Sequence, residues 1–283
     1  MASLKRKLLC NAEGDFFVDD ACIDCSVCRE FAPEVFGDGI NTACVRKQPE
    51  GKEEKKKALM ALISCPVGAI GTLKREEARK ALWLLPQELE EGVYRCGYAS
   101  RHSYGAISYF IKHHEGNWFV DAPRRSGHLL QRLRELGGVK YIFLTHEDDV
   151  GDASFYAQAF GARVIIHEKD SRAYPSAHIK IKGYEPVIMG DFTLIPTPGH
   201  TPGHMVLLYK NFLFTGDHIW YSRDKDSLWA SKEYCWYSWE EQKRSIGRLL
   251  NYSFEWVLPG HGYSVKLEVA RIKEQLSSLL GDL

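Results

Sequence analysis

Three closely spaced cysteines and one distant cysteine constrain the first part of this chain more than any other feature. Cys22, Cys25 and Cys28 are separated by two residues each, and Cys65 stands far downstream, directly before Pro66. Three thiolates at this spacing can bind one corner of an iron–sulfur cube, with the fourth ligand supplied from elsewhere in the fold. Structural zinc sites instead pair two arms of two ligands each. The spacing therefore favours a [4Fe–4S] cluster over a zinc site.

The residues after the third cysteine distinguish this segment from the two-cluster ferredoxins. In those proteins a cysteine that serves the second cluster stands immediately before a proline. Here Pro33 is present and Ala32 replaces the cysteine, so the segment resembles a single-cluster ferredoxin. Cys44 is expected to be a buried structural thiol, with a stray cluster ligand as the alternative. We expect an apolar shell around the cluster from Ala21, Ile23, Val27, Phe31, Val67 and Ile70.

A second set of candidate ligands is scattered over the rest of the chain. The four pieces are His146–Asp149, Pro198–His200, Thr215–Asp217 and Pro259–His261. Imidazole and carboxylate groups bind divalent cations, and an open position in such a site leaves room for a reactive water. The pieces fall just after expected strands, where loops collect functional side chains on a rigid sheet. They predict a metal site built on strand ends.

From about residue 92 onward the chain resembles the metallo-β-lactamase superfamily, whose fold is an αββα sandwich. The resemblance rests on five motifs in the family's order: Phe119–Pro123, Phe143–His146, Thr197–His204, Phe214–Asp217 and Val257–Gly262. It implies that His146, His200 and His261 bind metal. It also implies that Asp217 bridges two metal ions.

The first ligand loop departs from the family's pattern His-x-His-x-Asp-His. In strict register Asp148 stands in place of the second histidine, Val150 in place of the aspartate and Gly151 in place of the last histidine. If the register shifts by two residues, Asp152 matches the aspartate and Ala153 stands in place of the last histidine. In either register the histidine of the second metal is missing. One site is then expected from His146, Asp148, His200 and Asp217. The other keeps Asp217 and His261, with help from Asp149 or Asp152. A set so rich in oxygen suits iron or manganese as well as zinc.

The order of the two signatures is similar to a fusion family of plants, algae and cyanobacteria. In that family a single-cluster ferredoxin precedes a divergent metallo-β-lactamase domain, and the loop follows the pattern His-x-Asp-Asp-Val-Ala-Asp-His. This chain matches the pattern at His146, Asp148, Asp149, Val150 and Asp152 and departs from it at Ala153. The resemblance covers nearly the full length of the chain.

The pattern of expected helices and strands changes along the chain and predicts an α+β protein of two domains. Residues 14–72 are expected to form the ferredoxin-like domain, residues 73–91 a linker, and residues 92–283 the metallo-β-lactamase-fold domain. A lysine-, glutamate- and leucine-rich stretch over 73–90 predicts a linker helix. The other expected helices cover 53–64, 127–136, 152–160, 238–250 and the C-terminus. The expected strands cover 16–18, 107–112, 118–121, 139–145, 164–167, 192–197, 205–209, 211–215 and 256–258.

Composition excludes some classes of partner. Lys plus Arg and Asp plus Glu number 37 each, so no net field attracts nucleic acid or an anionic membrane. No apolar run approaches the roughly 20 residues needed to span a bilayer. Thiolate ligands need reducing conditions, which indicates the cytosol or an organelle matrix, with a plastid in keeping with the resemblance. The expected partners are a small-molecule substrate and a ferredoxin reductase or another redox protein.

Three functions fit the two signatures. The first is a metal-dependent hydrolase of a small ester or thioester, coupled to redox state, in which Asp217 or the neighbouring carboxylate of Asp148 moves the proton. The second is an oxidoreductase in which the cluster feeds electrons to a non-haem iron or di-iron site. The third is a non-catalytic redox sensor or electron-transfer adaptor.

Two further groups of residues are expected near the metal site. His204 and His218 are the best candidates for orienting the metal ligands. Aromatic residues gather after Asp217 and are expected either to roof a substrate pocket or to pack in the core. They are Trp220, Tyr221, Trp229, Tyr234, Trp236, Tyr237 and Trp239.

Overall fold

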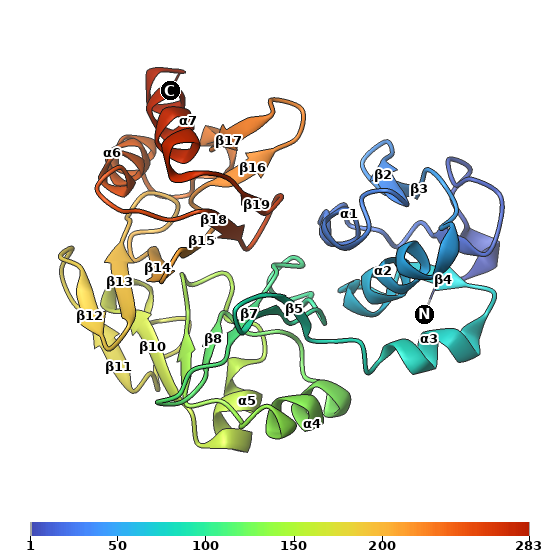
Figure 1. Ribbon diagram of the computed structural model, residues 1–283, viewed down its shortest axis with the longest axis horizontal. Helices are drawn as coiled ribbons and strands as arrows, with labels where there is room; N and C mark the ends of the chain where they lie inside the picture. Colours follow the sequence, from blue (N-terminus) through green and yellow to red (C-terminus); the bar gives the residue numbers. More distant parts are fainter. Residues whose placement is uncertain (1, 283) are drawn as a thin grey trace. The chain divides into compact units, whose positions relative to one another are not determined.

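The helices and strands of the chain gather into two compact units (Figure 1). The computed structural model describes residues 2–282, without the side chains of Arg75 and Asp282. The first unit runs to Lys140 and includes Gly151–Ala162; the second comprises Tyr141–Val150 and the residues from Arg163 onward. The domain boundaries expected around residues 73–91 stay a prediction.

The cysteine-bearing part of the first unit is built from two small antiparallel ladders and two helices. Strand β1 pairs with β4, and β2 pairs with β3. Helix α2 ends at Ser64 because Cys65, which precedes Pro66, adopts an extended conformation. The elements are β1 (Phe16–Val18), α1 (Val27–Phe31), β2 (Phe36–Asp38), β3 (Ala43–Val45), α2 (Gly51–Ser64) and β4 (Ile70–Thr72).

Two expectations about this part are corrected by the structure. The linker helix is shorter than expected: α3 covers Arg75–Ala81, and Gln87–Glu90 forms strand β5 instead. The residues after Pro86 pair with the next strand, and this tertiary pairing overrides their helical composition. Cys44 is buried as expected, but it forms a disulfide with Cys10 and is not a free thiol.

The rest of the first unit is an antiparallel ladder with two helices. Strand β6 pairs with β5 and β7, and β7 pairs with β8. Helix α4 begins where the Ser126 side chain accepts a hydrogen bond from the backbone N–H of Leu129. The elements are β6 (Val93–Arg95), β7 (Tyr109–Ile111), β8 (Trp118–Val120), α4 (Gly127–Glu135) and α5 (Ala153–Phe160).

The second unit contains a parallel group of three strands and a six-stranded sheet. The parallel strands are β9 (Tyr141–Phe143), β10 (Arg163–His167) and β11 (Ile179–Ile181). The six-stranded sheet has the order β12 (Val187–Met189), β13 (Phe192–Pro196), β14 (Met205–Tyr209), β15 (Phe212–Gly216), β18 (Trp256–Pro259) and β19 (Val265–Lys266). Its first four strands are antiparallel, and β15 runs parallel to β18. Strands β16 (Trp220–Ser222) and β17 (Ser227–Trp229) form a separate hairpin.

Two helices share one buried core with the six-stranded sheet. Helix α6 (Trp239–Leu249) starts where the Ser238 side chain accepts a hydrogen bond from the backbone N–H of Glu241. Helix α7 (Val269–Asp282) follows the last strand. The core residues are Ile195, Val206, Leu213, Ile219, Leu228, Ala230, Ile246, Leu249, Phe254, Val257, Ile272, Leu276 and Leu279. Among the residues described, no helix is long and apolar enough to cross a membrane.

Candidate metal centres

The four predicted cluster cysteines line one cavity in the first unit. Cys22, Cys25 and Cys28 surround it from the first loop, and Cys65 reaches it from the end of α2. Backbone N–H groups point at two of the sulfurs: Ala43 N lies 3.3 Å from Cys22 Sγ and Ala69 N lies 3.3 Å from Cys65 Sγ. The remaining lining is mostly apolar, and it includes four members of the expected shell, namely Ile23, Val27, Val67 and Ile70.

The chemistry of these cysteines fits a [4Fe–4S] cluster. Burial raises the pKa of Cys25 to about 12, and burial also raises the pKa values of Cys28 and Cys65. Without iron these thiols would therefore stay protonated at neutral pH. Four sulfurs around one cavity, with N–H groups aimed at them, match the ligand number and the N–H···S bonding of a cluster site.

The histidines and aspartates of the second signature meet in the second unit. His146, Asp148 and Asp149 follow β9, His200 follows β13, Asp217 follows β15 and His261 follows β18. His146 and His200 are almost completely buried, whereas Asp148 is half exposed. Loops at the ends of neighbouring strands thus bring together residues that lie more than a hundred positions apart in the sequence.

Two imidazole nitrogens lie close to two carboxylate oxygens in this group. His146 Nε2 is 3.8 Å from both Asp148 Oδ2 and Asp217 Oδ2. His200 Nε2 is 3.6 Å from Asp148 Oδ2 and 3.7 Å from Asp217 Oδ2. These separations are too long for hydrogen bonds, and both buried imidazole nitrogens lack a hydrogen-bond partner within residues 2–282. Ligand atoms of His146, Asp148 and His200 all fall within 4.8 Å of one another, and Asp217 Oδ2 lies close to both imidazoles, so these side chains are of the types and spacing that hold a divalent cation.

The other ring nitrogen of each histidine is already held. The backbone carbonyl of Tyr234 accepts a hydrogen bond from His200 Nδ1, which leaves the Nε2 lone pair free for a metal. His146 Nδ1 lies 2.9 Å from the hydroxyl of Thr145. Both rings are therefore oriented before any metal arrives.

Electrostatics favour a cation between these side chains. Burial lowers the pKa of His146 to about 4, so its imidazole is neutral at pH 7. Burial also disfavours the charged form of His200, but the carboxylates of Asp148 and Asp217 outweigh it and raise that pKa. Burial likewise opposes ionisation of Asp217, yet the neighbouring imidazoles, His261 foremost, hold its pKa well below the usual range. Ionised carboxylates and neutral imidazoles are the forms that bind divalent metals.

A second group of donors lies beside the first. Ligand atoms of His146, Asp149 and Asp217 all fall within 4.8 Å of one another. His261 Nδ1 lies 2.8 Å from Asp217 Oδ1. Gly260 leaves the necessary space, since a Cβ there would lie 2.8 Å from Asp149 Oδ2 and 3.0 Å from Asp217 Oδ1. His261 Nδ1 also lies 3.0 Å from Asp217 Oδ2, so Asp217 contacts both groups of donors, as a bridging carboxylate would.

The two aspartates considered for the second site occupy different places. Asp149 is buried within the donor group just described. Asp152 belongs to the first unit, where its carboxylate accepts a hydrogen bond from Arg125 N, 2.7 Å away. Gly151 explains the missing histidine in the strict register, because a Cβ at that position would lie 1.9 Å from the carbonyl oxygen of Ala122.

Asp170 is a site residue that the motifs did not reveal. It follows β10 and is fully buried, and its carboxylate accepts hydrogen bonds from Glu147 N, Gly203 N and the Thr201 hydroxyl. It therefore ties the loop of His146 to the loop of His200. No neighbouring sequence pattern marks Asp170, since its partners come from two distant loops.

Replacing Asp170 with alanine is expected to destabilise the metal-free protein by about 3 kcal/mol or more, because three buried donors would each lose an acceptor at about 1 kcal/mol or more. Asp170→Asn keeps one carbonyl oxygen and should lose less. Urea denaturation of both variants checks this. Equal loss for alanine and asparagine would contradict the assigned role of the acceptors.

Of the two histidines expected to orient the candidate ligands, His204 makes a hydrogen bond to one of them and His218 does not. His204 Nε2 accepts a hydrogen bond from Asp217 N at 3.3 Å, and its Nδ1 lies 2.9 Å from the Thr197 hydroxyl. The ring of His218 stacks on that of His204 with centroids 5.4 Å apart. Neither ring nitrogen of His218 has a partner in the described part of the chain. His204 thus orients Asp217 directly, whereas His218 only packs.

The stability of the metal-free protein is expected to fall below pH 6.5. Burial lowers the pKa of His218 to about 3, so between these pH values the unfolded chain binds a proton that the folded chain does not. His218→Leu should reduce the slope of unfolding free energy against pH by roughly 1 kcal/mol per pH unit between pH 4 and 6. Urea titrations at three pH values measure this. An unchanged slope would mean that His218 titrates normally.

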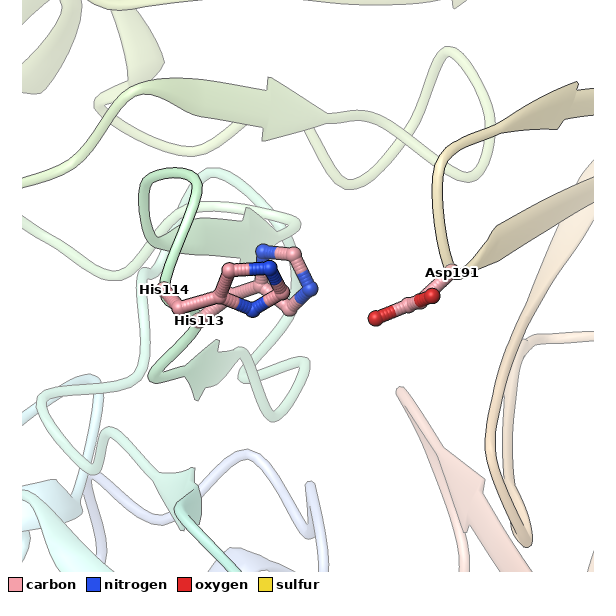
Figure 2. Close-up of side chains that lie close together, drawn as sticks. All are labelled: His113, His114 and Asp191. Carbon is pink, nitrogen blue, oxygen red and sulfur yellow. The ribbon is translucent and has the colours of Figure 1, made fainter.

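Two other histidines lie away from these centres. His113 and His114 occupy the turn between β7 and β8, with ring centroids 4.4 Å apart (Figure 2). His113 is half-buried and His114 is exposed. Asp191, also drawn in Figure 2, belongs to the second unit and lies in the turn between β12 and β13.

Known proteins resemble parts of this chain. Two curated relatives are hydroxyacylglutathione hydrolases. The one from Anaeromyxobacter dehalogenans is 34% identical over 79 residues, 27% of this chain and 31% of the relative; the one from Citrobacter koseri is 26% identical over 113 residues, 38% of this chain and 45% of the relative. The chain therefore spans less than half the length of these relatives.

Solved structures share the fold of the second signature. A metallo-beta-lactamase family protein from Thermus thermophilus superposes with a TM-score of 0.51 at 21% identity, covering 69% of this chain and 80% of that one. The DIM-1 metallo-beta-lactamase gives a TM-score of 0.53 at 17% identity, covering 69% and 95%. Both show an αββα metallo-β-lactamase fold for this part of the chain.

Two family models match the chain in the order that the motifs predict. Residues 18–72 match the 4Fe-4S single cluster domain of ferredoxin I. Residues 108–261, more than half of the chain, match the metallo-beta-lactamase superfamily. The chain is therefore a member of the metallo-beta-lactamase superfamily that carries a single-cluster 4Fe-4S ferredoxin domain ahead of its metallo-β-lactamase domain.

Proposed function

We propose that the protein is a metal-dependent hydrolase of a small thioester or ester. The observation that carries this proposal is the closeness of two imidazoles to two carboxylates: His146 Nε2 and His200 Nε2 each lie 3.6–3.8 Å from Asp148 Oδ2 and from Asp217 Oδ2. A divalent cation held there would act as a Lewis acid. It would lower the pKa of a water molecule toward neutrality, so that the water could lose a proton and serve as the nucleophile. The residues fit such an ion in number, chemistry and orientation.

Asp148 is the residue placed to move the proton. Its side chain is 51% exposed, whereas the other three donors are largely buried, so it lies where substrate and water enter. The neighbouring imidazole of His200 lowers the pKa of Asp148, which keeps its carboxylate ionised and able to accept a proton. Asp217 is also ionised but more enclosed, and we assign it to holding the metals.

Hydrolysis assays with Asp148→Asn test this role. At saturating metal concentration the rate is expected to fall on the order of 10²–10⁴-fold, the usual contribution of a general base. Asp224→Asn, in the exposed turn between β16 and β17, is the matched control and should not change the rate. A hydrolysis rate equal to that of the wild type in Asp148→Asn would show that Asp148 does not transfer the proton. If the metal-loaded wild type hydrolyses neither thioesters nor esters, the proposed hydrolase function is wrong.

The substrate is expected to have an apolar or planar part. Trp236 is 65% exposed, its ring lies 5.8 Å from that of His200, and its backbone N–H donates to the His200 carbonyl oxygen at 3.0 Å. An exposed aromatic ring held beside a metal ligand provides a surface for an organic group. The names of the curated relatives describe an acyl group carried on glutathione, a thioester, and this supports thioesters as the first substrates to test.

Trp236→Ala is expected to raise KM for a thioester substrate about 10-fold with little change in kcat, because it removes apolar contact with the substrate and leaves the donor atoms in place. Steady-state kinetics measure both constants. A fall in kcat at unchanged KM would place Trp236 in ligand orientation instead.

We further propose that the cluster makes the activity dependent on redox state. Hydrolysis consumes no electrons, so the cluster would act as a sensor in this scheme. The support is the presence of both sites on one chain. Rates measured with the cluster oxidised and with it reduced by dithionite should differ, and equal rates would separate the cluster from catalysis.

One observation favours a second candidate, an oxidoreductase with non-haem iron. Three aspartates, Asp148, Asp149 and Asp217, accompany the histidines in the donor groups. Such oxygen-rich sets suit iron as well as zinc. In that case the cluster would pass electrons from a ferredoxin reductase or another redox protein to the second site. Failure of both hydrolysis and electron transfer would leave a redox sensor or adaptor.

A further inference from the structure

A segment outside both family matches packs against the cysteine loop of the cluster cavity. Residues 99–105 lie between the ferredoxin match at 18–72 and the metallo-β-lactamase match at 108–261. Gly105 has φ +94°, and a Cβ there would lie 2.7 Å from Cys25 Cβ and 2.9 Å from Cys25 Sγ. The Tyr104 hydroxyl donates to the carbonyl oxygen of Ile23 at 2.6 Å. The cysteine loop is therefore packed directly against this segment, within one compact unit.

An arginine of the metallo-β-lactamase domain holds the other arm of the cluster site. Arg124 Nη1 donates to the carbonyl oxygens of Cys65 and Ala99, each at 3.0 Å, and Nη2 donates to the carbonyl oxygen of Ile63 at 2.7 Å. Its guanidinium also lies over the Tyr98 ring, 5.5 Å from the centroid. The Arg124 side chain thus joins the end of α2, where Cys65 follows, to the 99–105 segment.

This guanidinium has a positive charge and no carboxylate partner. Within residues 2–282, no aspartate or glutamate forms an ion pair with Arg124; the nearby Asp152 accepts instead from Arg125 N. Partly buried charges are costly unless an opposite charge compensates them. Four thiolates around an iron–sulfur core carry a net negative charge, which grows by one when the cluster is reduced. A cluster bound to the four cysteines would therefore supply the negative charge that compensates the positive charge of Arg124.

We propose that Arg124 and the 99–105 segment complete the cluster site, with Arg124 as a positioning residue that orients the Cys65 arm and raises the reduction potential of the cluster. The positive charge stabilises the reduced form more than the oxidised form, because the reduced cluster is the more negative. The metallo-β-lactamase domain thereby shares control of the electron affinity of the ferredoxin domain. This inference concerns the cluster alone and holds whichever reaction the second metal site performs.

The test is a reduction potential measured by EPR-monitored titration of the full-length holoprotein. Arg124→Gln removes the charge and should shift the potential to a more negative value. Arg124→Lys keeps the charge and should stay close to the wild type. Arg125→Gln is the matched control, because this neighbouring side chain is exposed and only its backbone N–H is used, and its potential should be unchanged.

Two results would overturn the proposal. Equal reduction potentials in the wild type and in Arg124→Gln would mean that the charge of Arg124 does not affect the cluster and that its role is structural only. If Arg124→Gln cannot retain its cluster, the lysine variant decides: retention of the cluster at a potential near the wild type supports the role of charge. Loss of the cluster from the lysine variant as well would refute that role.

Discussion

Asp217→Ala is expected to lose its divalent metals and with them all hydrolytic activity above background. The Asp217 carboxylate lies close to His146, His200 and His261 and belongs to both groups of donors, so one substitution removes a donor from both. Substitutions outside the ligand shell already cost 10–100-fold in metal affinity. Loss of a shared ligand should therefore cost at least about 100-fold. Metal content after dialysis and hydrolysis rate are the two measurements.

The matched control for this substitution is Asp224→Ala. Asp224 belongs to the same unit but lies exposed in the turn between β16 and β17, so metal content and rate should match the wild type. Because the neighbouring core of α6, α7 and the sheet does not include Asp217, the variant should still fold. An Asp217→Ala protein that keeps two equivalents of metal would contradict the bridging assignment.

Cys25→Ser is expected to lose the brown colour and most of the iron held by the ferredoxin domain. Cys25 is one of the four sulfurs around the cavity, and serine is a much poorer ligand for cluster iron. The second unit should keep its own metal, because its donors and its buried core all lie within that unit. Absorption spectra and separate iron and zinc analyses report the two centres independently.

Cys235→Ser provides the control for the cysteine substitution. Cys235 lies in the second unit and donates to the carbonyl oxygen of Gly199, a bond that a serine hydroxyl can replace. Its cluster spectrum should be that of the wild type. If Cys25→Ser also unfolds the second unit, then the two units are not independent in stability.

Most of the residues that meet in the candidate metal site were predictable because local chemistry marks them. His200, Asp217 and His261 stand in turns framed by glycine or proline directly after apolar strands, and the structure gathers all three. The four cysteines were predictable from spacing alone. In both cases the information lies within a few residues of the ligand.

Other features depend on contacts that no short pattern records. Asp149 lies in a group of possible ligands, whereas Asp152 accepts a hydrogen bond from Arg125 N, and the loop sequence does not distinguish these two surroundings. The role of Asp170 arises from donors on two separate loops. Strand β5 exists because β6 pairs with it, although its composition favours a helix.

The central claim is that one chain holds an iron–sulfur cluster and a separate divalent metal site. Metal analysis of protein purified without oxygen, with EPR of the reduced form, tests it most directly. We expect about four irons per chain and an EPR signal from the reduced cluster. We also expect about one or two zinc ions, which should be lost in Asp217→Ala. Iron well above four with a second paramagnetic signal would favour the oxidoreductase. Zinc on the cysteines, or no metal beyond the cluster, would contradict the claim.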